Sequence, residues 1–146
     1  MTLAAGFSAG SASAQARDIH GLWIDHTGRG AVQIERCGSR LCGKIVWLRK
    51  ATDRRGRPLR DMLNPRRAKR GKPICGLQII GGLRRQSDGS WDQGWIYAPD
   101  KGETYDVELR MRGRNRLQVK GYLGLKLFNE TYVWRRAPQD LKLCTL

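Results

Sequence analysis

The stretch "TYDVELRMRGRNRLQVKGYL", residues 104–123, alternates between apolar and polar side chains on both sides of a short turn. In its first half every second residue is apolar, namely Tyr105, Val107, Leu109 and Met111. The residues between them are Thr104, Asp106, Glu108 and Arg110. A period of two places the two sets on opposite faces of a β-strand. "GRN" at 113–115 predicts a tight turn, and the alternation resumes after it at Leu117, Val119 and Leu123. The stretch therefore predicts an antiparallel hairpin with one face turned towards a core.

Six further segments of strand character surround this hairpin. They are "GLWID" (21–25), "AVQIER" (31–36), "GKIVWLRK" (43–50), "CGLQII" (75–80), "WIYAP" (95–99) and "LKLFNETYVWRR" (125–136). Gly, Asp and Asn residues separate the segments, and "SDGSWDQG" (87–94) is expected to be one such turn. About eight short, evenly spaced strands predict an all-β protein, which is either an antiparallel barrel or, as second choice, a sandwich.

Residues 1–16 have the composition of the back half of a secretory signal peptide. The run is small and apolar and ends in the cleavage pattern Ala14-Gln15-Ala16. Because a basic n-region is missing, we interpret it as a truncated signal peptide, with a plain Ala/Ser tail as the alternative. Cleavage there leaves residues 17–146 as a single β-barrel domain, periplasmic or secreted, with a long basic loop at about residues 50–74. No later segment approaches the roughly 18 apolar residues that span a bilayer, so no transmembrane segment is expected.

Four cysteines in an exported chain favour disulfide bonds. "RCGSRLCG" places Cys37 and Cys42 at the two ends of a four-residue loop, across which a disulfide can form. Elimination then pairs Cys75 with Cys144. A zinc site is the competing interpretation, but the Cys-x4-Cys spacing with distant partners does not favour it.

The order of several motifs resembles one bacterial family over residues 21–136. The motifs are "GLWIDHTGRGAVQIERCGSRLCGKIVWL", "DMLNP", "GLQIIGG", "GWIYAPDKGETYDVEL" and "LQVKGYLGLKLFNETYVW". Together they are similar to the secreted family known as domain of unknown function 2147. The resemblance implies a small lipocalin-like β-barrel of about eight antiparallel strands, exported across the inner membrane, and it implies no reaction. One departure is Ala98, where the resemblance implies a polar residue.

The net charge of +15 comes from 28 basic and 13 acidic residues and predicts attraction to anionic partners. It is concentrated in "RRGRPLRDMLNPRRAKRGKP", residues 54–73. The stretch can be a nucleic-acid arm, a solvated connection or a functional loop. It contains no aromatic residue for base stacking, so nucleic acid is not favoured. A functional loop would display a rim for anionic surfaces, made of Arg54, Arg55, Arg57, Arg66, Arg67, Lys69 and Arg70.

The middle of this basic stretch, "DMLNP" (61–65), does not have a solvating composition. Met62 and Leu63 are expected to be buried, while Asp61 and Asn64 can hold the backbone through side-chain hydrogen bonds. A short helix around residues 61–68 is conceivable, but Pro65 interrupts it. We therefore expect this segment to dock on the barrel.

Catalysis has little support in the sequence. Asp25 and His26 could form a base with its orienting carboxylate, although His26 more simply begins a polar turn. Asp106 and Glu108 could form a carboxylate pair, although their strand pattern fits a solvent face with ion pairs. Because nucleophile and metal motifs are also missing, the expectation is no catalytic residue, no metal, no cofactor and no enzyme.

The aromatic residues suggest one plugged end and one open end of the barrel. Trp23 is expected to plug one end, and the resemblance to lipocalin-like barrels implies that Arg135 or Arg136 covers it. Trp95 and Tyr97 share a strand face next to a turn, and we place a ligand site there, formed by Trp95, Tyr97, Asp61, Asn64 and Tyr105. The alternative is that Trp95 and Tyr97 are ordinary core residues.

The function favoured by the sequence is an exported, non-catalytic binding protein for a small apolar or amphipathic ligand at the barrel mouth. The alternative is an adaptor that meets an envelope protein or another anionic envelope component through the basic loop. A hydrolase is the third choice, and the chain is expected to be a monomer.

Overall fold

The computed structural model describes residue 6 and residues 18–144 of the chain. The expected signal peptide, residues 1–16, lies outside this range except for residue 6. Within residues 18–144 the chain forms eight strands and one short 3-10 helix, η1 (Arg67–Lys69). The strands are β1 (Gly21–Ile24), β2 (Gly30–Cys37), β3 (Arg40–Leu48), β4 (Gln78–Arg85), β5 (Trp91–Ala98), β6 (Glu103–Met111), β7 (Arg116–Leu123) and β8 (Leu125–Arg136). No helix in the described part of the chain has the length and apolar character of a membrane span.

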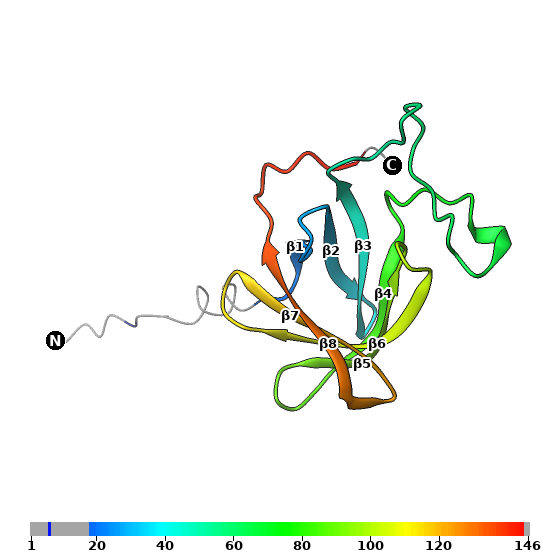
Figure 1. Cartoon of the computed structure of the whole chain (residues 1–146). Helices are drawn as coiled ribbons and strands as arrows, with labels where there is room; N and C mark the ends of the chain where they lie inside the picture. The colour runs from blue at the N-terminus through cyan, green and yellow to red at the C-terminus, as the bar shows by residue number, and fades with distance from the viewer. Residues whose placement is uncertain (1–5, 7–17, 145–146) are drawn as a thin grey trace.

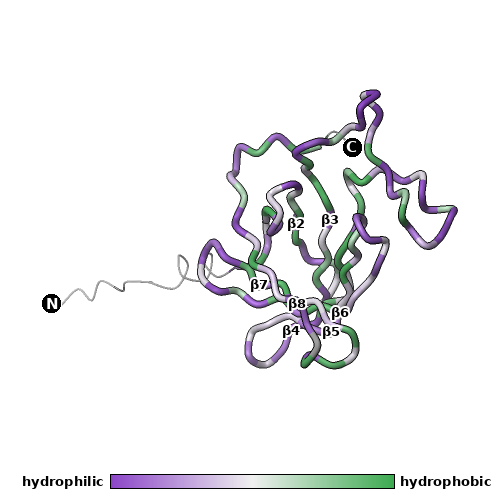
Figure 2. Tube along the Cα trace, in the orientation of Figure 1, coloured by the Kyte–Doolittle hydropathy of each residue, from purple (hydrophilic) through white to green (hydrophobic). Residues whose placement is uncertain are grey.

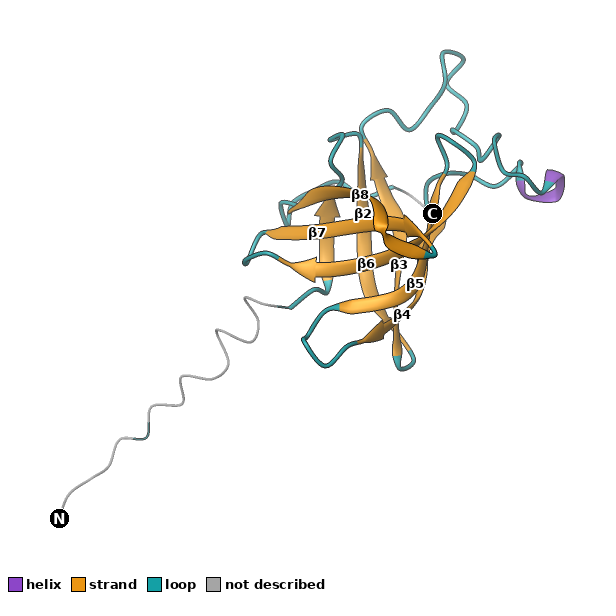
Figure 3. Ribbon diagram, turned by 60° about the horizontal axis from the view of Figure 1, so that its bottom comes forward, coloured by secondary structure: helices purple, strands orange, loops and turns teal. Residues whose placement is uncertain are grey.

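The strands form a closed antiparallel barrel in chain order (Figure 1, Figure 3). Closure depends on β1, which pairs with β2 on one side and with β8 on the other. At the seam Trp23 lies opposite both Val32 and Arg136. A closed barrel leaves no free sheet edge, and it confirms the predicted barrel over the alternative sandwich.

The strand boundaries around β4 and β5 correct the sequence prediction. The expected strand at 75–80 begins at Gln78 and continues to Arg85, and half of the expected turn at 87–94 belongs to β5. In β5 the pattern is interrupted by a β-bulge between Trp91 and Gly94, where Gln93 adopts a positive φ of 62°. The carboxylate of Asp92 accepts a hydrogen bond from the backbone amide of Gln93 at 2.7 Å. A bulge inserts a residue and breaks the period of two, so the strand pattern was not visible there.

The predicted hairpin of β6 and β7 is confirmed, but its alternation is incomplete, because Leu123 is 66% exposed and Glu108 is buried. Val107 and Leu109 are fully buried and lie beside Gly121 and Val119 of β7. The inward residues of all strands join in one core cluster, and Figure 2 shows how the hydrophobic colour follows the strands while the connections are mostly hydrophilic.

One end of the barrel is closed by Trp23, which is fully buried. Its indole nitrogen donates a hydrogen bond to the carbonyl of Ile19 at 2.9 Å. The guanidinium of Arg136 lies 4.0 Å from the ring centroid and donates to the carbonyls of His20, Asp18 and Arg114. The predicted plug is therefore confirmed, and the cation that covers it is Arg136 rather than Arg135.

Both predicted disulfide bonds are formed. Cys37 and Cys42 join the ends of the β2–β3 hairpin with Cα atoms 5.8 Å apart, and Cys75 and Cys144 have Cα atoms 6.1 Å apart. The second bond attaches the C-terminal tail to the residues that precede β4. All four cysteines are used, which excludes the zinc interpretation for them.

Candidate functional site

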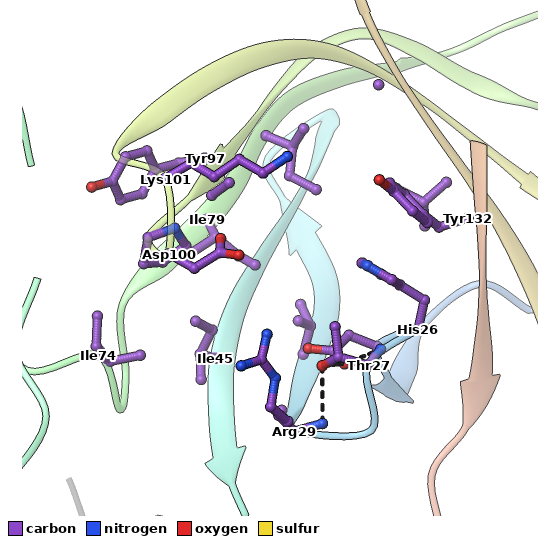
Figure 4. Close-up of a pocket in the computed structure, with 18 of the residues that line it drawn as sticks. His26, Thr27, Arg29, Ile45, Ile74, Ile79, Tyr97, Asp100, Lys101 and Tyr132 are labelled. Atoms are coloured by element: carbon purple, nitrogen blue, oxygen red, sulfur yellow. Dashed lines mark hydrogen bonds between the residues drawn. The ribbon is translucent and has the colours of Figure 1, made fainter. Parts of the chain in front are cut away.

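The end of the barrel opposite Trp23 opens into a cavity of about 1180 Å³ (Figure 4). Four connections surround its mouth, because they all leave the strands at this end. They are the β1–β2 turn, the basic loop between β3 and β4, the β5–β6 turn and the β7–β8 hairpin, each of which contributes lining residues. A pocket that serves drug-sized ligands has roughly 300–1,000 Å³, so this cavity has room for one.

The interior wall of the cavity is mainly apolar. Side chains that point inward from six different strands form it, namely Val32, Ile45, Ile79, Ile96, Val119 and Trp134. Gly121 of β7 also lines the cavity, and a methyl group added there would meet its nearest neighbour only at 3.9 Å. The missing side chain at Gly121 therefore contributes to the open volume.

Polar side chains gather at the rim of the cavity. The rings of His26 and Tyr132 stack with centroids 3.8 Å apart and 16° between their planes (Figure 4). Arg29, Asp100 and Lys101 also line this part of the site. The wall and rim together suit a molecule with an apolar body and a polar end.

The possible catalytic pair of Asp25 and His26 is not formed. The Asp25 carboxylate accepts hydrogen bonds from the Thr27 amide at 2.9 Å and the Thr27 hydroxyl at 2.6 Å. These bonds fix the β1–β2 turn, as an aspartate often does at the start of a turn. His26 instead stacks on Tyr132. The Asp25 carboxylate therefore stabilises the β1–β2 turn, and the His26 imidazole forms part of the cavity rim.

Two of the five predicted ligand-binding residues line the cavity and three do not. Tyr97 and Tyr105 line the cavity. Trp95 does not lie among the lining residues: it is on the outer face of β5, is 38% exposed, and its ring covers Gly81 of β4. The placement of Trp95 at the site is corrected, since the inward residue at this point of β5 is its neighbour Ile96. Ala98, the departure from the family pattern, also lines the mouth.

Asp61 and Asn64, the remaining two, hold the basic loop instead of lining the cavity. The Asp61 side chain is fully buried and accepts hydrogen bonds from the Tyr97 hydroxyl at 2.6 Å and the Asn64 amide at 2.8 Å. Burial, together with the hydrogen bond and the negative charge of Asp61, raises the pKa of Tyr97 to about 12. The loop therefore docks on β5 as predicted, but through a carboxylate.

The burial expected for Met62 and Leu63 is wrong. Their side chains are 64% and 56% exposed, and both line the mouth of the cavity. Asp61 takes the buried position, and the two residues after it point outward. The backbone of Leu63 also packs against the β5–β6 turn, where a side chain at Gly102 would come within 2.1 Å of the Leu63 carbonyl oxygen.

The seven residues of the predicted basic rim lie on the loop that projects from the barrel (Figure 1). Arg54, Arg55, Arg57, Arg66 and Arg67 are exposed, and Lys69 and Arg70 are partly exposed. Among residues 18–144, Arg57 is the one of the seven with an ion pair, which it forms with Asp53 at 2.9 Å. In place of the short helix considered at residues 61–68, the chain forms η1, which begins after Pro65.

A polar cluster on the outer face of β5 and β6 was not found from the sequence. Lys126 forms an ion pair with Asp92 and a second one with Glu108 at 2.6 Å. The Tyr122 hydroxyl also donates to Asp92, at 2.7 Å. Burial alone raises the pKa of Asp92, but the hydrogen bonds from Lys126, Tyr122 and the Gln93 amide and the Lys126 charge lower it below its ordinary value.

This cluster changes the interpretation of the carboxylates on β6. Glu108 is only 4% exposed because it lies beneath Lys126, so its position is not a plain solvent face. Neither Asp106 nor Glu108 lines the cavity. The hydrolase hypothesis required one of them to point into it. In the described part of the chain, no group of three or more His, Cys, Asp or Glu side chains is arranged to hold a metal ion.

Comparison with known proteins places this geometry among bacterial barrels. Residues 21–136 match a family model described as "Uncharacterized protein conserved in bacteria (DUF2147)". Among solved structures, the chain is similar to protein HP1028 from the human pathogen Helicobacter pylori, which is described as belonging to the lipocalin family. The two share 17% identity with a TM-score of 0.76, over 88% of this chain and 92% of that chain. This likeness shows a lipocalin-like fold and no shared activity. No curated protein matched the sequence.

Proposed function

Because the chain belongs to the DUF2147 family of uncharacterized bacterial proteins, as its motifs predicted, and folds as a lipocalin-like barrel, we propose that it binds a small apolar or amphipathic molecule. The observation that carries the proposal is the cavity of about 1180 Å³ with its apolar wall and polar rim. Apolar pockets with a few convergent polar groups are the usual form of small-molecule sites.

The arrangement of the cavity supports an amphipathic ligand in particular. Ile45, Ile79 and Val119 would contact an apolar body, and its removal from water would drive binding. His26, Arg29 and Lys101 at the rim would face a polar or anionic end. We propose a binding role, and the hydrolase hypothesis built on Asp106 and Glu108 loses its support because neither carboxylate lines the cavity.

We also propose that the protein works outside the cytoplasm, in the periplasm or as a secreted protein. Two disulfide bonds support this proposal, since such bonds persist in oxidising compartments and are rare in the cytosol. A mass measurement of the chain recovered from its own cells would show whether residues 1–16 are removed.

The ligand site can be tested by filling the cavity. A phenyl ring introduced by Gly121→Phe would project into the open space, and the position has ordinary strand backbone with room around it. The matched control is Val133→Phe, which adds the same ring to the outer face of β8, where Val133 is 48% exposed. The measurement is titration with the neutral fluorescent probe N-phenyl-1-naphthylamine.

We expect the unmodified chain and Val133→Phe to bind the probe with similar affinity and Gly121→Phe to bind at least about tenfold more weakly, which is 1.4 kcal/mol. Absence of binding to the unmodified chain, or equal binding by all three proteins, would contradict the proposed site.

A further inference from the structure

Three large apolar side chains are exposed at the mouth of the cavity. Met62 and Leu63 come from the basic loop, and Leu123, which is 66% exposed, comes from the end of β7. A single exposed apolar residue is ordinary, but a group of them beside a cavity marks an interaction surface. All three residues line the cavity mouth, although Leu123 lies 60 residues after Leu63 in the sequence. They therefore belong to the same end of the barrel.

The exposure of Met62 and Leu63 is imposed by the structure around them. Asp61 on one side is buried and bonded to Tyr97, and Asn64 on the other side is bonded to Asp61. The Leu63 backbone is packed on Gly102. With both flanks fixed, the two apolar side chains cannot turn inward and are presented outward on a held segment.

Cations lie on the same loop as Met62 and Leu63 and along the cavity mouth. Arg54, Arg55, Arg66 and Arg67 are exposed on the same loop, and none of them has an ion pair in the described part of the chain. Arg49, Lys50 and Lys101 line the cavity mouth itself. Asp25, Asp100 and Glu130 also line the cavity, but the loop cations and the net charge of +15 leave basic charge in excess.

We propose that the protein docks with its cavity mouth on an anionic lipid bilayer. Met62, Leu63 and Leu123 enter the boundary between headgroups and acyl chains, and the loop arginines contact the lipid phosphates. Apolar side chains ringed by Lys and Arg are the combination that binds anionic membrane interfaces. Proteins that bind single-stranded nucleic acid combine cations with aromatic side chains on which bases stack, and residues 54–73 contain no aromatic residue.

This inference goes beyond the proposed ligand site and assigns a consequence to it. A mouth placed on the bilayer lets an amphipathic molecule pass between the membrane and the cavity without crossing water. The docking surface and the inner wall use different residues, so each can be disabled alone.

The test is co-sedimentation of the full chain with lipid vesicles. The vesicles contain phosphatidylglycerol and phosphatidylethanolamine, or phosphatidylcholine alone, at low and at high salt. We expect binding to the anionic vesicles and its loss at high salt, because screening removes the attraction of exposed charges beyond a few ångströms. Met62→Ser/Leu63→Ser should weaken binding by about tenfold for each apolar side chain removed, and Val133→Ser, on the side of the barrel, should not. Arg66→Gln/Arg67→Gln should weaken it by about fivefold for each cation.

Other outcomes would overturn the proposal. Equal binding to both vesicle types, no binding to either, or a Val133→Ser effect as large as that of Met62→Ser/Leu63→Ser would each do so. Failure here is distinguishable from failure of the ligand site, since Arg66→Gln/Arg67→Gln, at two positions outside the cavity lining, should still bind the soluble probe and Gly121→Phe should still bind anionic vesicles.

Discussion

The bond between Tyr97 and Asp61 is the connection that holds the basic loop on the barrel, and Tyr97→Phe tests it. The substitution removes one hydroxyl and keeps the ring. Asp61 is fully buried and keeps a single side-chain donor, Asn64 at 2.8 Å, after the change. Hydrogen bonds to charged groups contribute about 1.5–3 kcal/mol, and a buried acceptor that loses its donor is costly. We therefore expect the free energy of unfolding to fall by about 2 kcal/mol.

The matched control is Tyr105→Phe. Tyr105 also donates to a carboxylate, that of Glu103, and its pKa is likewise raised to about 12, chiefly by this hydrogen bond. Glu103 is exposed, however, so water replaces the lost donor. The free energy of unfolding should change by less than about 0.5 kcal/mol.

Urea unfolding followed by tryptophan fluorescence measures both variants. With a slope near 2 kcal/mol per molar urea, Tyr97→Phe should lower the midpoint by roughly 1 M and Tyr105→Phe by less than about 0.3 M. Limited trypsin digestion should also cut residues 54–72 faster in Tyr97→Phe. Equal midpoints for the two variants, with unchanged digestion, would refute the assignment of Asp61 as the anchor of the loop.

Three further predictions concern the frame of the barrel. Arg136→Ala removes the cation over Trp23 and the hydrogen-bond donor to three backbone carbonyls, so it should lower the free energy of unfolding by about 3 kcal/mol in thermal unfolding. Arg135→Ala, at an exposed position, should change it by less than about 0.5 kcal/mol. Equal effects of the two substitutions would contradict the capping role of Arg136. Replacing Cys75 and Cys144 by Ala should lower the free energy of unfolding by about 4 kcal/mol in urea unfolding, because this disulfide closes a loop with a sequence separation of 69. Replacing Cys37 and Cys42, with a separation of 5, should lower it by about 2 kcal/mol. A larger loss from the Cys37–Cys42 pair would be inconsistent with stabilisation by loop entropy. Lys126→Met should lower the free energy of unfolding by about 2 kcal/mol at pH 7 and by clearly less at pH 3. The value at pH 7 is kept low because the lysine is partly exposed and solvent screens its ion pairs. The lowered pKa of Asp92 contributes stability above the ordinary aspartate pKa that is lost as the pH falls through the folded value, so a cost that stays constant between pH 7 and pH 3 would speak against this pair.

The alternation of residues 104–123 was enough to predict a β-hairpin, because a period of two is typical of strands. The barrel was predicted from about eight such segments, with a sandwich as the alternative. The disulfide pairing was also predictable, since one pair had to close a short hairpin. The β4–β5 region was not, because the bulge at Gln93 moves the pattern out of phase and a bulge leaves no regular mark in sequence.

The site was predicted in outline, but several of its contacts were not, because they join residues that are far apart in the sequence. A cavity opens near the β5–β6 turn, where the mouth was predicted, and Tyr97 and Tyr105 line it. Met62 and Leu63 were expected inside because apolar residues usually are, yet the buried position belongs to Asp61, whose partner is 36 residues away. Lys126 could not be linked to Asp92 and Glu108 because the contact depends on how β8 enters the barrel. Val119 lines the cavity wall and lies on the predicted apolar face of its strand, so alternation is a signal from which such wall residues could have been predicted.

Native mass spectrometry of the chain purified from its own cells tests the central claim, that the cavity holds a small apolar or amphipathic molecule. The account predicts a fraction with added mass that gentle activation releases as one class of small molecule, and loss of this fraction in Gly121→Phe but not in Val133→Phe. A spectrum with the mass of the bare, doubly disulfide-bonded chain alone, or added mass that Gly121→Phe retains in full, would contradict it.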